Sequence, residues 1–170
     1  MLISRKLEES ITKKLGSGKV ILVLGPRQTG KTTLLTGICR QSERWLLLDC
    51  DDLLVREQLQ DANVEKLKQI IGTHTLILID EAQRVRNIGL TLKILADHFD
   101  HVQILVSGSS ALELANEINE PLTGRKWEFM LYPVSWQELL EQFGYLDTLR
   151  QLEQRLIFGQ YPEVITHPGQ

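Results

Sequence analysis

The sequence has few cysteines and no long apolar run. Its two cysteines, Cys39 and Cys50, have neither metal-ligand spacing nor the number that a disulfide framework needs. No apolar run approaches the roughly 18 residues that cross a membrane, and the first residues lack the apolar centre of a signal peptide. We therefore expect buried thiols, a cytoplasmic location and no membrane partner.

The chain also lacks an excess of positive charge. Its 170 residues carry a formal net charge of −3, so no global positive field would attract a phosphate backbone. This balance does not support nucleic acid as a partner, although a local basic patch stays open. With 42% hydrophobic and 24% charged residues, the composition is that of one ordinary folded domain.

Short apolar runs alternate with amphipathic stretches along the chain. Because parallel strands covered on both faces are apolar almost throughout, the first four runs are typical of such strands. The alternation predicts an α/β fold, with a parallel sheet between two layers of helices. The predicted strands are residues 20–24, 45–49, 75–80, 102–107 and 127–132.

Helical spacing of apolar residues separates these runs. A serine at position 135 with a glutamate three residues later forms the pattern of a capping box, which predicts a helix start there. We expect the apolar residues that share one face of each predicted helix to belong to the core. The predicted helices are residues 34–39, 64–71, 88–99, 111–118 and 136–143, with a further helical stretch at 148–158.

The stretch GPRQTGKTT follows the first predicted strand and precedes a predicted helix. It fits the phosphate-loop pattern G-x-x-x-x-G-K-[ST], in which glycines allow a tight turn whose N–H groups face phosphate oxygens. We expect Lys31 to reach the β- and γ-phosphates and the Thr32 hydroxyl to ligate Mg²⁺. The predicted nucleotide-binding residues are Gly25, Pro26, Arg27, Gln28, Thr29, Gly30, Lys31, Thr32 and Thr33.

Two adjacent carboxylates end the third predicted strand, in LILIDEAQ. Asp80 is placed to hold Mg²⁺ through its water shell. Glu81 is placed to orient or deprotonate a water molecule against the γ-phosphate. The alternative is a solvated strand end, which a neighbouring phosphate loop disfavours. The pair indicates nucleotide hydrolysis.

A second acidic stretch, DCDD at residues 49–52, follows the second predicted strand. A small-molecule kinase needs an acidic group for its acceptor substrate, often after the second strand, so that alternative stays open. A turn and a helix start rich in aspartate is the favoured interpretation. No N/T-K-x-D element for reading guanine occurs, which favours adenine by absence only.

Two further candidates lie outside these motifs. Ser107 and Ser109, in SGSS at the end of the fourth predicted strand, are placed to bond the γ-phosphate or the attacking water, or simply to cap a turn. Arg125, before the fifth predicted strand, is either a surface arginine or a finger for the γ-phosphate of a neighbouring subunit.

With these residues in place, the chain resembles the ATPase domain of a bacterial and archaeal AAA+-type family. The likeness spans residues 20–164, and its most specific part is LTGR followed by LYPVSWQEL and YPEV. It implies a three-layer αβα P-loop NTPase with five parallel strands in the order 5-1-4-3-2, and ATP with Mg²⁺ as cofactors. It places the SGSS serines at the sensor position, where many AAA+ proteins have asparagine, and it strengthens Arg125 as a finger in a homo-oligomer.

We divide the chain into an N-terminal helix (1–19), the ATPase core (20–135) and C-terminal helices (136–170). The resemblance implies that these helices lead to a further C-terminal domain. The leading hypothesis is a Mg²⁺-dependent ATPase that binds ATP or ADP and drives an attached domain or partner. Alternatives are a nucleotide-gated switch with little turnover, a nucleic-acid-stimulated helicase-like ATPase, and the kinase.

Overall fold

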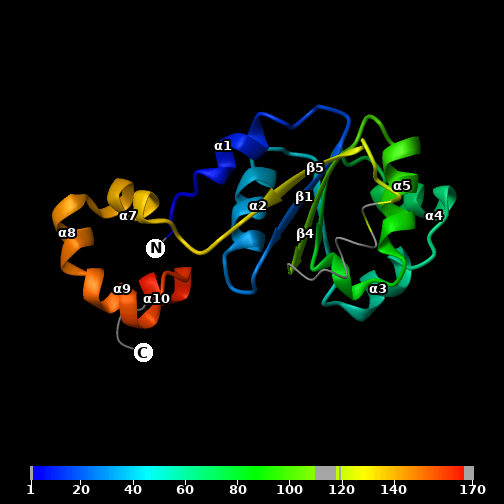
Figure 1. The fold of residues 1–170 in the computed structure, drawn as a ribbon. Helices are drawn as coiled ribbons and strands as arrows, with labels where there is room; N and C mark the ends of the chain where they lie inside the picture. Colours follow the sequence, from blue (N-terminus) through cyan, green and yellow to red (C-terminus); the bar gives the residue numbers. More distant parts are fainter. Residues whose placement is uncertain (1, 110–117, 119, 167–170) are drawn as a thin grey trace.

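The computed structural model describes residues 2–109, 118 and 120–166, which form an α/β fold around one sheet (Figure 1). The sheet has five strands, all parallel, in the order β2-β3-β4-β1-β5. Read from the other edge this is 5-1-4-3-2, so the predicted order is confirmed. The strands are β1 (Val20–Gly25), β2 (Trp45–Asp49), β3 (Leu76–Asp80), β4 (Gln103–Ser109) and β5 (Lys126–Met130).

Helices cover both faces of the sheet and complete the three layers (Figure 1). One face carries α1 (Leu7–Thr12) and α2 (Lys31–Cys39), and the other carries α3 (Leu53–Leu59), α4 (Val64–Ile71) and α5 (Ile88–His98). The helix predicted over residues 111–118 lies, except for Ile118, outside the described residues.

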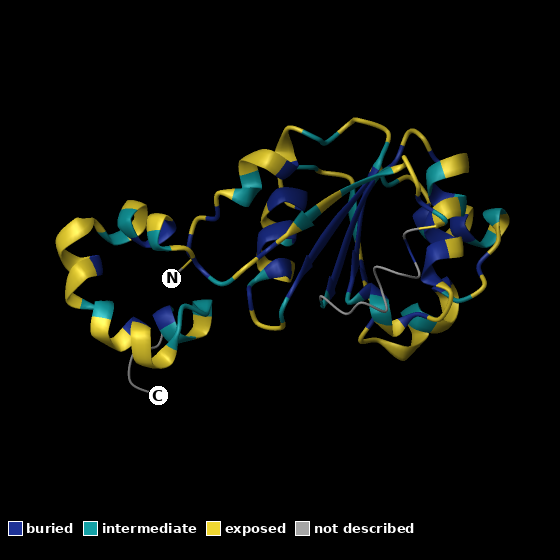
Figure 2. Cartoon of the chain, viewed as in Figure 1, coloured by how far each residue is buried: buried dark blue, intermediate teal, exposed yellow. Residues whose placement is uncertain are grey.

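The core lies on both faces of the central strands (Figure 2). Along β1, Ile21 and Val23 join the cluster with α2, whereas Leu22 and Leu24 join the cluster on the opposite face. This alternation follows from the two-residue repeat of a strand. Because each successive side chain enters one core or the other, the central strands are apolar throughout.

The second strand does not share this double coverage. It lies at an edge of the sheet, and Leu47 on it is 41% exposed. The expectation that all four leading runs are covered on both faces was therefore wrong for β2. An edge strand has a neighbouring strand on one side only, and its apolar side chains are correspondingly less enclosed.

Up to residue 166, four helices follow β5, and they curve away from the sheet (Figure 1). The predicted capping box is confirmed, since Ser135 caps α7 and the Glu138 side chain accepts from the Ser135 N–H. The predicted stretch 148–158 is two helices, with the break at Gln151. The helices are α7 (Trp136–Phe143), α8 (Tyr145–Arg150), α9 (Leu152–Phe158) and α10 (Pro162–Thr166).

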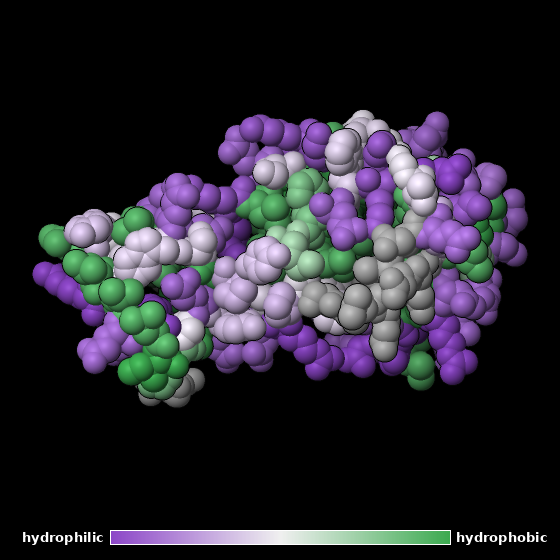
Figure 3. All heavy atoms as spheres, viewed as in Figure 1, coloured by the Kyte–Doolittle hydropathy of each residue, from purple (hydrophilic) through white to green (hydrophobic). Residues whose placement is uncertain are grey.

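These C-terminal helices contribute little to the main core. Leu146 on α8 and Leu156, Ile157 and Phe158 on α9 are largely exposed. Apolar residues gather on the surface of this C-terminal part (Figure 3). The connection back to the rest of the chain is a small cluster of Ile3, Val134, Leu139 and Ile165. None of the helices within the described part of the chain has the length and apolar character that crossing a bilayer requires.

A buried ion pair accompanies that small cluster. Arg5 Nε donates to Glu138 Oε1 at 3.2 Å, and the backbone N–H of Lys6 donates to the same oxygen at 2.9 Å. Burial alone would raise the pKa of Glu138. The N–H groups of Ser135 and Lys6, together with the Arg5 guanidinium, outweigh burial and lower that pKa below its ordinary value.

Both cysteines are buried, as expected, and burial raises the pKa of each thiol to about 12. Because the thiolate is the reactive form, we expect neither Cys39 nor Cys50 to react with iodoacetamide in the folded protein at pH 8. Mass spectrometry should show two modifications only after denaturation. Glu43→Cys adds an exposed thiol as a positive control, and labelling of Cys39 or Cys50 in the folded state would contradict this environment.

The lowered pKa of Glu138 predicts how stability depends on pH. A carboxyl with a folded pKa below its unfolded value of about 4.3 stabilises the fold above that value and loses this contribution as the pH falls through the folded pKa. We expect the free energy of unfolding to fall more steeply from pH 5 to pH 3 in the wild type than in Glu138→Gln. Denaturant titrations measure the slope, and exposed Glu65→Gln is the control. Equal slopes for wild type and Glu138→Gln would contradict the prediction.

Candidate functional site

The phosphate loop joins the end of β1 to the start of α2, and its backbone requires glycine at two positions. A Cβ at Gly25 would lie 2.2 Å from the carbonyl oxygen of Leu131, so no side chain fits there. Gly30 has a φ of 91° at the start of α2, a left-handed conformation that side chains disfavour. The loop conformation, and not only the motif, accounts for both glycines.

Lys31 folds back over this loop. Its Nζ donates to the carbonyl oxygens of Gly25 and Pro26, both at 2.9 Å, and the residue is buried. Burial lowers the pKa of Lys31, and the nearby carboxylates of Glu81 and Asp80 act against that shift. The lysine is thus held within the loop and close to the acidic pair.

Asp80 is the meeting point of three elements. The Thr32 hydroxyl, from the first turn of α2, donates to Asp80 Oδ2 at 2.8 Å. The Ser107 hydroxyl, from β4, donates to Oδ1. Because β4 lies between β1 and β3, the end of β4 falls between the phosphate loop and the acidic strand. The structure therefore brings Thr32, Asp80 and Ser107 together.

Glu81 stands next to this group in a constrained conformation. Its φ is 52°, in the left-handed region, and its N–H donates to the Ser107 hydroxyl oxygen at 3.1 Å. The side chain accepts a hydrogen bond from the Gln83 amide, whose oxygen accepts from the Ser109 N–H at 3.3 Å. Gln83 lies in the short helix Ala82–Arg84.

Gln83 is a site residue that sequence reasoning missed. It is the last letter of DEAQ, so its position two residues after Glu81 was visible in the motif. Nothing in the sequence shows that its side chain joins Glu81, just after β3, to Ser109 on β4. That contact depends on which strands are neighbours.

The acidic stretch after β2 is explained by local structure. Asp52 caps α3 by accepting from the Leu54 N–H at 2.8 Å, and Asp49 accepts from the Asp51 N–H at 2.9 Å. Asp51 pairs with Arg84 at 3.2 Å. The interpretation as a turn and helix start is confirmed, because these contacts account for the aspartates without an acceptor substrate.

Arg125 does not join the site of its own chain. Its Nε pairs with Asp97 at 3.0 Å, and its carbonyl oxygen accepts from the N–H of Val20. Val20 begins β1, whereas Gly25 ends it at the phosphate loop. Arg125 therefore lies at the end of the sheet where the strands begin, and the loop lies at the end where they finish.

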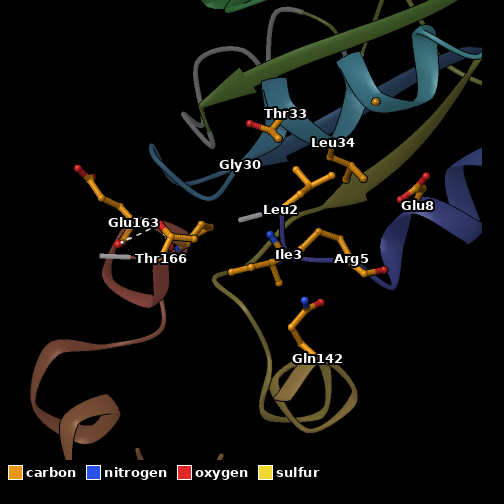
Figure 4. A pocket seen from close by; sticks show the side chains of 13 residues that line it. Leu2, Ile3, Arg5, Glu8, Gly30, Thr33, Leu34, Gln142, Glu163 and Thr166 are labelled. Carbon is orange, nitrogen blue, oxygen red and sulfur yellow. Dashed lines mark hydrogen bonds between the residues drawn. The ribbon is translucent and has the colours of Figure 1, made fainter. Parts of the chain in front are cut away.

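Two adjoining cavities border the phosphate loop. The smaller, about 330 Å³, is lined by loop residues, Glu81 and residues Pro162 and Glu163 of α10. The larger, about 470 Å³, lies between the N-terminal segment, α2 and α10 (Figure 4). Gly30, Thr33, Pro162 and Glu163 border both. The site thus has a polar part at the loop and a second compartment with Leu2, Ile3 and Leu34 in its walls.

The donor set at Asp80 suits a metal ion shared with phosphates. Within the described residues, no group of three or more His, Cys, Asp or Glu side chains could hold an ion alone. Mg²⁺ is usually bound through one or two carboxylates, water and substrate phosphates. One carboxylate and one hydroxyl beside a phosphate loop fit that pattern.

The chain is similar in sequence to a protein family and to several known proteins. A family described as an AAA domain matches residues 17–140. Uncharacterized proteins of Mycobacterium bovis and Mycobacterium tuberculosis are each 32% identical over 127 residues, 74% of this chain and 28% of each relative. An uncharacterized protein of Methanocaldococcus jannaschii is 24% identical, covering 95% of this chain and 40% of that protein. The chain thus spans less than half the length of these curated relatives.

Solved structures share the fold. A Walker-type ATPase of Pyrococcus abyssi superposes with a TM-score of 0.65 at 18% identity, covering 98% of this chain and 69% of that one. The Pif1 helicase of Candida albicans superposes with a TM-score of 0.54 at 17% identity, covering 89% and 44%. At such identities the likeness concerns the fold alone. By the match over residues 17–140, the chain belongs to the AAA domain family, and its fold is that of an AAA+-like P-loop ATPase.

Proposed function

We propose that this domain binds ATP with Mg²⁺ and hydrolyses it, and that hydrolysis drives an attached domain or partner. One observation carries the proposal: Asp80 accepts a hydrogen bond from Thr32 at 2.8 Å, next to Glu81 and the buried Lys31. This arrangement joins a phosphate-binding element, a metal-binding pair and a candidate base at one edge of the sheet.

Each residue of the loop and the acidic pair has a proposed role in binding. The loop N–H groups and the positive end of α2 face the phosphates, and Lys31 contacts the β- and γ-phosphate oxygens. Thr32 and Asp80 would hold Mg²⁺, which would supply positive charge beside the phosphates. The larger cavity beside Gly30 and Thr33 has room for the nucleoside, which supports a nucleotide rather than a simple phosphate as ligand.

Hydrolysis requires a water molecule directed at the γ-phosphorus. Glu81 is proposed to orient this water and accept its proton while the water oxygen bonds to phosphorus and the bond to the leaving ADP oxygen breaks. Gln83 and Ser109 fix the side chain of Glu81 through the hydrogen bonds described above. Ser107 holds both Asp80 and the Glu81 backbone.

Arg125 is proposed to act on a neighbouring copy of the chain. Arg125 lies where the strands begin, at the opposite end of the sheet from its own phosphate loop, so it does not contact that loop. Its side chain is partly exposed and therefore available to a second molecule. An arginine supplied in trans stabilises charge on the γ-phosphate during transfer. The sites would then be complete only in a homo-oligomer.

A second candidate function is a nucleotide-gated switch with little turnover. The hydrogen bond from Gln83 to Glu81 favours it, because a carboxylate held by an amide is less free to accept a proton from water. A helicase-like ATPase draws support from the likeness of DEAQ to helicase motifs and from the fold shared with Pif1, and the net charge of −3 argues against it. A salt-sensitive stimulation of turnover by DNA or RNA would favour that alternative.

Substitutions at Lys31 and Glu81 separate binding from turnover. We expect Lys31→Ala to abolish MgATP binding, because it removes the buried ammonium from the loop. We expect Glu81→Gln to bind ATP within a few-fold of wild type and to release phosphate at least about a hundredfold more slowly. Calorimetry and phosphate release measure the two effects. A wild type that turns over no faster than Lys31→Ala, even at high protein concentration, would contradict hydrolysis.

A mixing experiment tests the trans role of Arg125. Arg125→Ala and Glu81→Gln should each be nearly inactive alone, since one lacks the finger and the other the base. An equal mixture should regain turnover, because the intact finger of one copy can meet the intact base of the other. Lys93→Ala, at an exposed position of α5, is the control and should keep wild-type turnover. A mixture no more active than its components would contradict a finger in trans.

A further inference from the structure

The buried side chain of Arg5 contacts the phosphate loop and borders the larger cavity, but not the smaller one. Its Nη1 donates to the carbonyl oxygen of Thr29 at 2.7 Å, and its Nη2 donates to that of Tyr132 at 2.6 Å. Its Nε donates to Glu138. We propose that Arg5 is a positioning residue that fixes the phosphate-binding conformation of the loop; this rests on the proposed function.

Arg5 holds the peptide between Thr29 and Gly30 by its carbonyl oxygen. In a trans peptide the C=O and N–H groups point in opposite directions within one plane. Because Arg5 holds the Thr29 carbonyl oxygen, the Gly30 N–H of the same peptide points the opposite way, away from Arg5. Arg5 borders the larger cavity but not the smaller one. Gly30 lies between the two cavities, where phosphate oxygens would need that donor.

The loop needs this support because its conformation is not a favoured one. Gln28 and Gly30 both have positive φ, at 64° and 91°. Lys31 bonds the carbonyl oxygens of Gly25 and Pro26, and the Thr29 hydroxyl forms a neutral bond to Pro26 at 2.9 Å. Among the contacts described, only Arg5 bonds the carbonyl oxygen of Thr29. A charge-assisted bond from a buried arginine is stronger than such a neutral bond. Arg5 thereby holds the left-handed turn before phosphate arrives.

Arg5 acts through the loop and not on the ligand. All three of its guanidinium nitrogens are already engaged with Glu138, Thr29 and Tyr132. Its side chain is 7% exposed, although the residue borders the larger cavity. A guanidinium presents its donors in a planar fork that meets three acceptors in different directions, which an ammonium on the same stem cannot match.

The same contacts tie the loop to the C-terminal helices. Glu138 belongs to α7, and Tyr132 lies in the connection from β5 to α7. Any ligand that favours the present loop conformation also favours the Arg5 contacts, since coupling between binding equilibria is reciprocal. Arg5 therefore links phosphate binding to the packing of α7 against the N-terminal segment.

The test compares Arg5→Lys with a control of matched kind. Arg5→Lys keeps the charge beside Glu138 but cannot keep all three bonds. Val102→Ala removes two buried methyl groups just before β4 begins, whereas the phosphate loop follows the end of the neighbouring strand β1, and so it lowers stability without touching the site. Each full chain is titrated calorimetrically with ATP in the presence of Mg²⁺, and its melting temperature is measured.

We expect Arg5→Lys to weaken MgATP binding about tenfold with an unchanged stoichiometry, the effect of losing a buried charge-assisted hydrogen bond. Val102→Ala should lower the melting temperature and leave the dissociation constant within twofold of wild type. A merely structural role for Arg5 would reduce the fraction of binding-competent protein without changing the dissociation constant. That result, or equal weakening by Val102→Ala, overturns the inference.

A second measurement needs no nucleotide. The amide resonance of Gly30 in the ligand-free protein should move in Arg5→Lys and stay in place in Val102→Ala, because only the former frees the Thr29–Gly30 peptide. An unmoved Gly30 resonance overturns the inference whatever the ligand. Failure of wild type itself to bind MgATP, with the expected resonance shift present, would instead contradict the proposed function.

Discussion

The carboxylate of Asp80 lies where β3 ends, and it accepts hydrogen bonds from hydroxyl groups on two other elements. Thr32 brings the first turn of α2, and with it the phosphate loop, to one oxygen. Ser107 brings β4 to the other. Since the residue is buried, an Asp80 without these donors would be a costly unpaired charge. The rest of the site is arranged around this requirement: Glu81 follows directly, and Lys31 lies across the loop.

The loop itself is held from two sides. Inside, Lys31 bonds the carbonyl oxygens of Gly25 and Pro26; outside, Arg5 bonds that of Thr29. A loop with positive φ at Gln28 and at the glycine beside Lys31 stores conformational cost, and these cations offset it through bonds to carbonyl groups. The outer bond comes from a segment that precedes β1 and is anchored on α7. The loop is therefore part of a larger unit that includes the C-terminal helices.

The sequence predicted most of the fold and the centre of the site. Strand positions followed from apolar runs, and the loop glycines and DEAQ followed from spacing that phosphate chemistry demands. The exposure of Leu47 was missed, because an apolar run does not tell an edge strand from a central one. Arg5 was missed because an isolated arginine before a short helix carries no pattern. Its partners lie 24 to 133 residues away along the chain.

By itself, the sequence determined the alternation of strands and helices, the two obligatory glycines, and the residue types at the phosphate loop and the acidic strand. These depend on local geometry: side-chain periodicity, positive φ and the need for donors and carboxylates at fixed spacing. Only the tertiary structure decided which side chains meet. The order of the strands joined Ser107 to Asp80 and Gln83 to Ser109. The same packing placed Arg125 at the opposite end of the strands, beside Asp97, and placed Arg5 against the carbonyl oxygen of Thr29. Such contacts depend on neighbours in space and not along the chain.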